Sequence, residues 1–309
     1  MVATVFCGVL CEVPALAQQT HILVVTGVAG DEEHTKKFAK WAGSFVDAAK
    51  KKDAVPEANI TLLADHGATK DGIEKALAGI AGRAKPNDGV FILLIGHGSF
   101  DGRVAMFNLM GPDLSATDCA KLLAKFTTQR VVLVNTASSS GAFLPTVAAP
   151  GRVIVTATKT GGERNATDFP EYFVAAYGDE AADRDRNGHV SVAEAFEYAK
   201  TKVAEAFKQK GYMLTEHATL DDGGGGQLAS TMFLGTGRAD AALKADMTDP
   251  AVRTLVEERD AIEQRIAALK LMKPSMDEAA YDAQMEKLLT DLALKTKALR
   301  DLQTKKEKP

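Results

Sequence analysis

Five short apolar runs recur between His21 and Lys159, and a segment of helical periodicity or a turn separates each from the next. The runs are rich in Val, Ile and Leu and almost continuously apolar: HILVVTGV, ITLLAD, VFILLIGHGS, RVVLVNTAS and RVIVTATK. Strands buried on both faces have this composition, whereas a strand with one wet face alternates apolar and polar residues. The pattern predicts a mainly parallel sheet covered by helices on both sides, a three-layer α/β domain over residues 21–240.

The segments between these runs carry helix signals. Thr69 and Ser115 stand where helix N-caps are expected, and Asp118 completes a capping box with Ser115. Cys119 shares a helical face with leucines and a phenylalanine, so it is expected to be a core residue rather than a nucleophile. The segment SFDGRVAMFNLMG breaks the alternation and predicts a small hairpin.

The last sixty residues follow a different pattern. Asp249-Pro250 predicts a helix start, and apolar residues then recur every three or four positions up to Lys273-Pro274 and again beyond it. We therefore expect an antiparallel, coiled-coil-like helical hairpin over residues 249–304. It would pack on its own domain or form the contact of a homo-oligomer.

Charge and hydropathy exclude two classes of partner. The 37 basic and 41 acidic residues give a net charge of −4, which leaves no basic excess for binding nucleic acid. No run of about 18 apolar residues is present, so no membrane span is expected.

Residues 1–17 have an apolar stretch followed by Ala15-Leu16-Ala17, the small-residue pattern of a signal-peptide cleavage site. This predicts a periplasmic or secreted protein. The alternatives are a buried N-terminal strand or a misassigned start codon, and the protein would then be cytoplasmic.

Polar residues follow two of the apolar runs at their carboxyl ends. His97 and Gly98 end one run, and Ser138 lies in the hydroxyl-rich sequence that ends the next. Ligands of open α/β sheets bind beyond the carboxyl ends of the strands. His97 could therefore act as a base toward Ser138, with the Gly98 backbone N–H available to an oxyanion. Serine-rich turns that only satisfy local backbone groups are the alternative.

These residues stand in an order that resembles the caspase-like cysteine peptidases, closest to the legumain type. His97-Gly98 matches that family's His-Gly, and Ala137-Ser138-Ser139-Ser140-Gly141 matches its Ala-Cys-x-Ser-Gly, with Ser138 in place of the nucleophilic cysteine. The resemblance covers about residues 21–240. It implies a caspase-like α/β sandwich that takes peptide or protein substrates.

The resemblance also implies where substrate would be held. The loop after the first strand helps to line the first specificity pocket of legumain-type relatives, which makes Glu33 a substrate-binding candidate together with Ser140. The alternative for the acidic residues of this loop is a first helical turn that complements the helix dipole.

The substitution of the cysteine leaves two functions open. A serine hydroxyl is a weaker nucleophile than a thiol and needs a well-oriented base. The chain is then either a weak or serine-dependent peptidase, or an inactive pseudopeptidase that acts as a binding or scaffolding protein.

An EF-hand-like loop follows in the sequence DRDRNGHVSVAE. It has side-chain ligand types at EF-hand positions 1, 3, 5, 9 and 12, glycine at position 6, and the carbonyl of His189 at position 7. These residues predict a structural Ca²⁺ site; the side-chain ligands are Asp183, Asp185, Asn187, Ser191 and Glu194. The alternative is a solvated turn that caps the following helix.

Overall fold

The computed structural model describes residues 19–235, 249–273 and 276–306. Its main sheet has six strands in the order β2-β1-β3-β7-β8-β9. The first five are parallel and β9 runs antiparallel to β8. Their bounds are β1 Thr20–Thr26, β2 Ile60–Leu63, β3 Gly89–Ile95, β7 Arg130–Asn135, β8 Arg152–Thr156 and β9 Thr219–Asp221. The five apolar runs therefore form the five parallel strands, as predicted.

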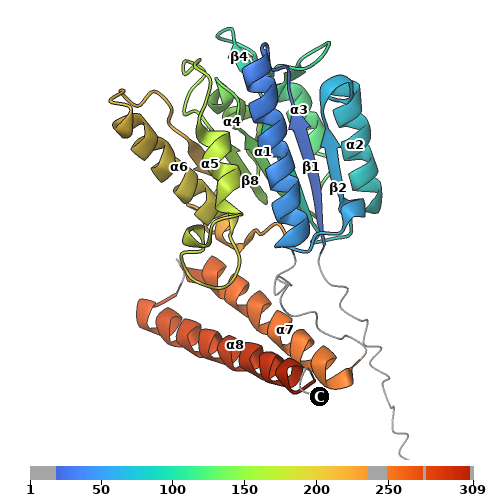
Figure 1. Cartoon of the computed structure of the whole chain (residues 1–309), viewed down its shortest axis with the longest axis vertical. Coiled ribbons are helices and arrows are strands. Elements are labelled where there is room, and N and C mark those ends of the chain that lie inside the picture. Colours follow the sequence, from blue (N-terminus) through green and yellow to red (C-terminus); the bar gives the residue numbers. More distant parts are fainter. Residues whose placement is uncertain (1–18, 236–248, 274–275, 307–309) are drawn as a thin grey trace, which may run out of the picture.

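Helices cover both faces of this sheet (Figure 1). One face carries α1 Glu32–Lys51, α5 Phe169–Ala176 and α6 Val192–Gln209, and the other carries α2 Lys70–Arg83, α3 Ala116–Leu123 and α4 Leu144–Val147. Strand residues alternate between the two cores: Ile22 and Val24 of β1 pack with α1, whereas Leu23 and Val25 pack on the opposite side. The three-layer α/β prediction is confirmed.

The predicted helix caps and the predicted core position of Cys119 are also confirmed. Thr69 caps α2 by accepting from the Gly72 N–H, and Ser115 with Asp118 forms the capping box of α3. Cys119 is buried on α3, and burial raises the pKa of its thiol to about 12, which fits a core residue.

The predicted hairpin is part of a three-stranded antiparallel sheet. Its strands are β4 Gly98–Phe100, β5 Ala105–Phe107 and β6 Leu114–Ser115. Short 3₁₀ turns complete the domain at Glu57–Asn59, Asp65–Gly67, Ser140–Phe143, Glu180–Ala182 and Ala229–Thr231.

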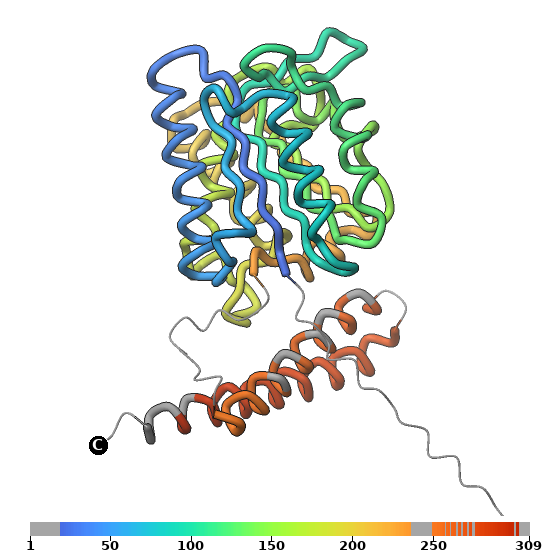
Figure 2. Tube along the Cα trace, turned by 90° about the vertical axis from the view of Figure 1, so that its right-hand side faces the viewer, coloured from blue at the N-terminus to red at the C-terminus, as the bar shows by residue number. Residues whose placement is uncertain are grey.

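The C-terminal residues form two antiparallel helices, α7 Pro250–Met272 and α8 Glu278–Lys306, which lie below the α/β domain at the end away from β4 (Figures 1 and 2). Two apolar clusters join them, one around Ile262, Ile266 and Leu288 and one around Val252, Val256 and Leu299. The helical hairpin is confirmed, and the homo-oligomer stays a prediction.

No helix in the described part of the chain has the length and apolarity that crossing a bilayer requires. The predicted signal peptide, residues 1–17, lies outside the described residues.

Candidate functional site

The carboxyl edge of the sheet brings the predicted site residues together. His97 follows β3 and Ser138 follows β7, and these two strands are paired neighbours. The loop after β1 arrives at the same edge, because β1 pairs with β3 on its other side. Three loops from adjacent parallel strands therefore meet around His97.

His97 is held in one orientation. Its Nε2 lies 3.1 Å from the carbonyl oxygen of Ala29, in the loop after β1. A carbonyl only accepts hydrogen bonds, so Nε2 carries the proton and, in the neutral ring, Nδ1 has the free lone pair. Burial is the main cause that lowers the pKa of His97, which favours this neutral form. The ring is therefore prepared to accept a proton at Nδ1.

The Ser138 hydroxyl is bonded to Gly98. Its Oγ accepts from the Gly98 N–H at 3.2 Å and donates to the Gly98 carbonyl at 3.1 Å. Among the hydrogen bonds of the described residues, none joins Ser138 directly to His97. The Gly98 N–H, predicted as an oxyanion donor, is thus engaged with the hydroxyl in this conformation.

Only glycine fits at position 98. A Cβ there would lie 2.5 Å from the Ser138 carbonyl oxygen and 2.9 Å from that of Met106, closer than real side chains approach backbone. The absence of a side chain is what lets the β4 backbone lie against the Ser138 turn.

The turn after Ser138 is fixed by the loop after β8. Ser139 has a φ of +57° and its N–H donates to the Glu163 carbonyl at 2.8 Å. Ser140 is 1% exposed, with its hydroxyl 3.2 Å from that of Thr158. Its role in substrate binding stays a prediction, and in this conformation its hydroxyl holds two loops together.

Glu33 lies on the exposed first turn of α1. Its carboxylate pairs with Lys37 at 2.6 Å, and the hydrogen bond from Lys37 lowers its pKa. Asp31 caps the helix by accepting from the His34 N–H. The dipole-complementing turn is therefore formed, and substrate binding by Glu33 stays a prediction.

His34 is a neighbour of His97, and no sequence pattern linked these two residues. The two rings lie edge to face with their centres 4.9 Å apart. The sequence placed His34 in the loop after the first strand, but only the strand order puts that loop beside β3.

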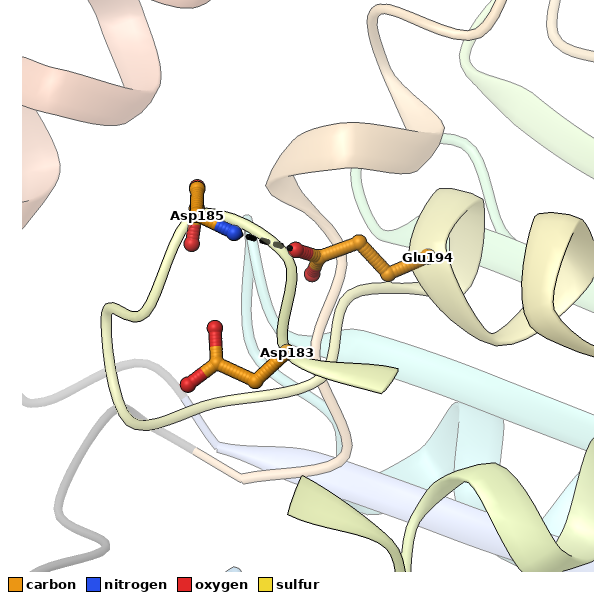
Figure 3. Close-up of side chains that lie close together, drawn as sticks. All are labelled: Asp183, Asp185 and Glu194. Atoms are coloured by element: carbon orange, nitrogen blue, oxygen red, sulfur yellow. Dashed lines mark hydrogen bonds between the residues drawn. The ribbon is translucent and has the colours of Figure 1, made fainter. Parts of the chain in front are cut away.

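The predicted metal loop lies at the other end of the domain, near the C-terminus of α1. Asp183, Asp185 and Glu194 each offer a carboxylate oxygen, and these oxygens lie within 4.8 Å of one another (Figure 3). Gly188 has a φ of +90°, which suits the glycine of a sharp loop turn. Burial raises the pKa of Asp183.

The remaining predicted ligands shape the loop. Asn187 Oδ1 accepts from the His189 N–H at 2.8 Å, and the His189 ring packs against Phe233. The Ser191 hydroxyl donates to Glu194 Oε2 at 2.7 Å in the capping box of α6. The turn that caps α6 is thus present together with the carboxylate cluster.

One cation reaches this loop from the C-terminal hairpin. Lys270 Nζ of α7 lies 2.7 Å from Asp185 Oδ2. Because the two residues are far apart in sequence, this contact could not be read from the loop motif.

Comparisons with known proteins identify a family for most of the α/β domain. The sequence profile described as the peptidase C13 family matches residues 47–220, more than half of the chain. No curated protein matches by sequence.

Several solved structures are similar to the chain at low identity. A protein from Geobacter sulfurreducens is 12% identical, with a TM-score of 0.44 and coverage of 66% of this chain and 92% of that one. The Drosophila initiator caspase Dronc is 11% identical, with a TM-score of 0.42 and coverage of 66% and 79%. Caspase-1 from Spodoptera frugiperda is 10% identical, with a TM-score of 0.46 and coverage of 72% and 92%.

Proposed function

Since the chain belongs to the peptidase C13 family, as its legumain-type motifs predicted, we propose that it acts on peptides at the carboxyl edge of its sheet. In this proposal His97 is the general base and Ser138 the nucleophile. The observation that carries it is the hydrogen bond from His97 Nε2 to Ala29, which leaves Nδ1 as the proton acceptor.

One rotation of the Ser138 side chain would prepare both the nucleophile and the oxyanion donor. Turning Oγ away from Gly98 frees the hydroxyl for His97 and frees the Gly98 N–H, now 3.2 Å from Oγ, for an oxyanion. Oγ then bonds to the substrate carbonyl carbon as its proton passes to Nδ1. The C–N bond breaks as the amine takes that proton, and water hydrolyses the resulting ester.

The second candidate function is a peptide-binding protein without catalysis, and the hydrogen bond that the Ser138 hydroxyl donates favours it. Ser138 donates its only proton to the Gly98 carbonyl at 3.1 Å, and a neutral serine needs that proton removed before it can attack. In this case the edge binds peptides and leaves them intact.

Replacing Ser138 with cysteine separates the two candidates. A thiol ionises far more readily than a hydroxyl, so Ser138→Cys should react rapidly with a peptide-based thiol electrophile when His97 can take the proton. We expect a labelling rate about 100-fold above that of the same variant carrying His97→Ala, measured by intact mass.

Ser139→Cys is the matched control, because it places a thiol one residue away in the same buried turn. If Ser138→Cys reacts no faster than this control, the dyad is wrong and the binding protein stands. Cleavage of a peptide library by the unaltered chain, absent in Ser138→Ala, would establish the serine peptidase.

We further propose that the loop from Asp183 to Glu194 binds Ca²⁺. Three carboxylates within 4.8 Å repel one another, and a divalent cation with oxygen ligands would relieve that repulsion. The loop connects α5 to α6 away from His97, so the role of the ion would be structural.

Calcium should raise the melting temperature, with a stabilisation of about 2.7 kcal/mol when it exceeds its Kd roughly 100-fold. Glu194→Gln should abolish this response. Asp118→Asn is the matched control, because Asp118 has the same capping-box role on α3 without a metal loop. If the unaltered chain has the same melting temperature in Ca²⁺ and in chelator, the loop binds no calcium and only caps α6.

Export directed by residues 1–17 and self-association through residues 249–304 complete the proposal. Support for export comes from the apolar stretch before Ala15-Leu16-Ala17.

A further inference from the structure

Beside His97 lies a pair of titratable groups that the mechanism above does not use. Asp31 Oδ1 accepts from the His34 N–H at 2.8 Å, and Asp31 Oδ2 lies 2.7 Å from His34 Nδ1. These hydrogen bonds lower the pKa of Asp31, so it is an ionised acceptor at neutral pH. The proton of His34 is therefore on Nδ1, directed at Asp31.

The His34 ring also packs against the His97 ring. The ring centres are 4.9 Å apart at an interplanar angle of 65°. Phe38, one helical turn later on α1, packs against His97 at 5.4 Å and 61°. Residues four apart share a helix face, so α1 presents two rings that hold His97 edge-on. With Nε2 bonded to Ala29, the His97 ring has little freedom to turn.

Few charges act on His97. Burial lowers its pKa most, and the Ala29 carbonyl opposes that effect. Of the charged groups, His34 lowers the pKa and Asp31 raises it, both from the first turn of α1. Among the described residues, neither the Ser138 turn nor the β4–β5 hairpin adds a charge that shifts it.

We propose that His34, held by Asp31, is a positioning residue for His97, fixing its ring with Nδ1 as the free acceptor. This inference rests on the proposed function, because it assigns His34 a role toward the same base. The His34 ring lies 4.9 Å from the His97 ring and lowers the pKa of His97. Beside His34, His97 therefore stays a competent base to lower pH than it would alone.

The test is an NMR titration of ¹⁵N-histidine-labelled full-length protein, with the His97 signals assigned through His97→Gln. His34→Gln removes the ring, whereas His34→Phe keeps a ring and removes its ionisable nitrogen atoms. We expect a higher His97 pKa in both variants. We also expect the Nε2–H tautomer signature of His97 to survive in His34→Phe and to weaken in His34→Gln.

Glu32→Gln is the matched control, an exposed change on the same helical turn that leaves His97 untouched. An unchanged His97 pKa and tautomer in both His34 variants would overturn the inference, leaving His34 a residue of the helix cap only.

The labelling rate of Ser138→Cys against pH separates this inference from the proposed function. Labelling that depends on His97 but has the same pH profile with His34→Gln overturns the inference alone. Labelling that never depends on His97, beside an NMR shift, overturns the proposed function and leaves the His34–His97 coupling standing.

Discussion

The carboxyl edge and the Asp183 loop are held together by different forces. In the Ser138 turn of the edge, neutral groups satisfy one another: Ser138 bonds to Gly98, Ser140 to Thr158, and the backbones approach so closely that side chains are excluded. In the loop, three carboxylates converge, and their partners include backbone N–H groups, the Ser191 hydroxyl and the ammonium of Lys270. The edge therefore depends on shape, and the loop depends on charge.

Because of this difference, we expect the two regions to respond differently to added side-chain volume, to pH and to ions. A close-packed backbone contact tolerates neither an added methyl group nor a shift of register, but is indifferent to pH and ions. A carboxylate cluster tolerates added volume in open loop space, but responds to cations. Paired substitutions, one in or beside each region, test this contrast.

The largest effect is expected from adding a methyl group at two glycines. In Gly141→Ala the Cβ would lie 2.5 Å from the Lys159 carbonyl oxygen and 2.6 Å from that of Thr158, so backbone must move. In Gly188→Ala the Cβ meets open space, and only the φ of +90° is unfavourable. We expect losses of about 3 kcal/mol and about 1 kcal/mol in the free energy of unfolding, measured by urea denaturation.

Equal losses at the two glycines would contradict the contrast. Adding Ca²⁺ should change the loss for Gly188→Ala and leave that for Gly141→Ala unaltered.

The second effect concerns two buried carboxyls, Asp53 beside the Asp183 loop and Glu216 at the start of α5. Burial raises the pKa of both Asp53 and Glu216 to about 7. Asp53 lines a cavity of about 680 Å³ with Asp183, and no hydrogen bond to its carboxylate is present among the described residues. Glu216 accepts from the Asp168 and Phe169 N–H groups at 2.8 Å, fixing the start of α5.

The folded pKa of Asp53 lies above its unfolded value near 4, so the protein loses stability as pH rises from about 4 to 7. Asp53→Asn mimics the protonated form. Its free energy of unfolding should exceed that of the unaltered chain by roughly 2 kcal/mol at pH 8, and the two should be equal below pH 4. Glu216→Gln should be destabilising at pH 8, because one of its two acceptor oxygens becomes a donor.

Chemical denaturation at pH 4, 6 and 8 gives both comparisons. A gain for Glu216→Gln at pH 8, or none for Asp53→Asn, would show that hydrogen bonds do not distinguish these carboxyls.

The smallest effect is expected at Lys270. Its pair with Asp185 is partly exposed, so Lys270→Met should lower stability without calcium by about 0.5 kcal/mol or less. Removing the ammonium frees a carboxylate oxygen, so calorimetry should show Ca²⁺ binding a few-fold more tightly. Lys295→Met, which breaks the Glu258 pair within the hairpin, is the control and should leave calcium affinity unchanged.

How much the sequence could predict depends on how far apart in the chain the contacting residues lie. The strands and the caps at Thr69 and Ser115 depend on neighbouring residues, and they were predicted correctly. The convergence of Asp183, Asp185 and Glu194 lies within one short loop, so spacing alone indicated it.

The contacts that spacing could not indicate are the long-range ones. His97 meets Ala29 and His34 only because β1 and β3 are neighbours, and Lys270 meets Asp185 only because α7 lies under the domain. The rotamer of Ser138, which places Oγ against Gly98, depends on packing in the folded turn.

The two outer strands of the main sheet are short: β2 has four residues and β9 has three. An edge strand presents unpaired N–H and C=O groups to which another chain can add, and a long flat edge invites such pairing. Strands this short offer a second copy only a few such groups. Two copies of this protein would accordingly be expected to associate without merging their sheets, so that each keeps its own six-stranded sheet separate.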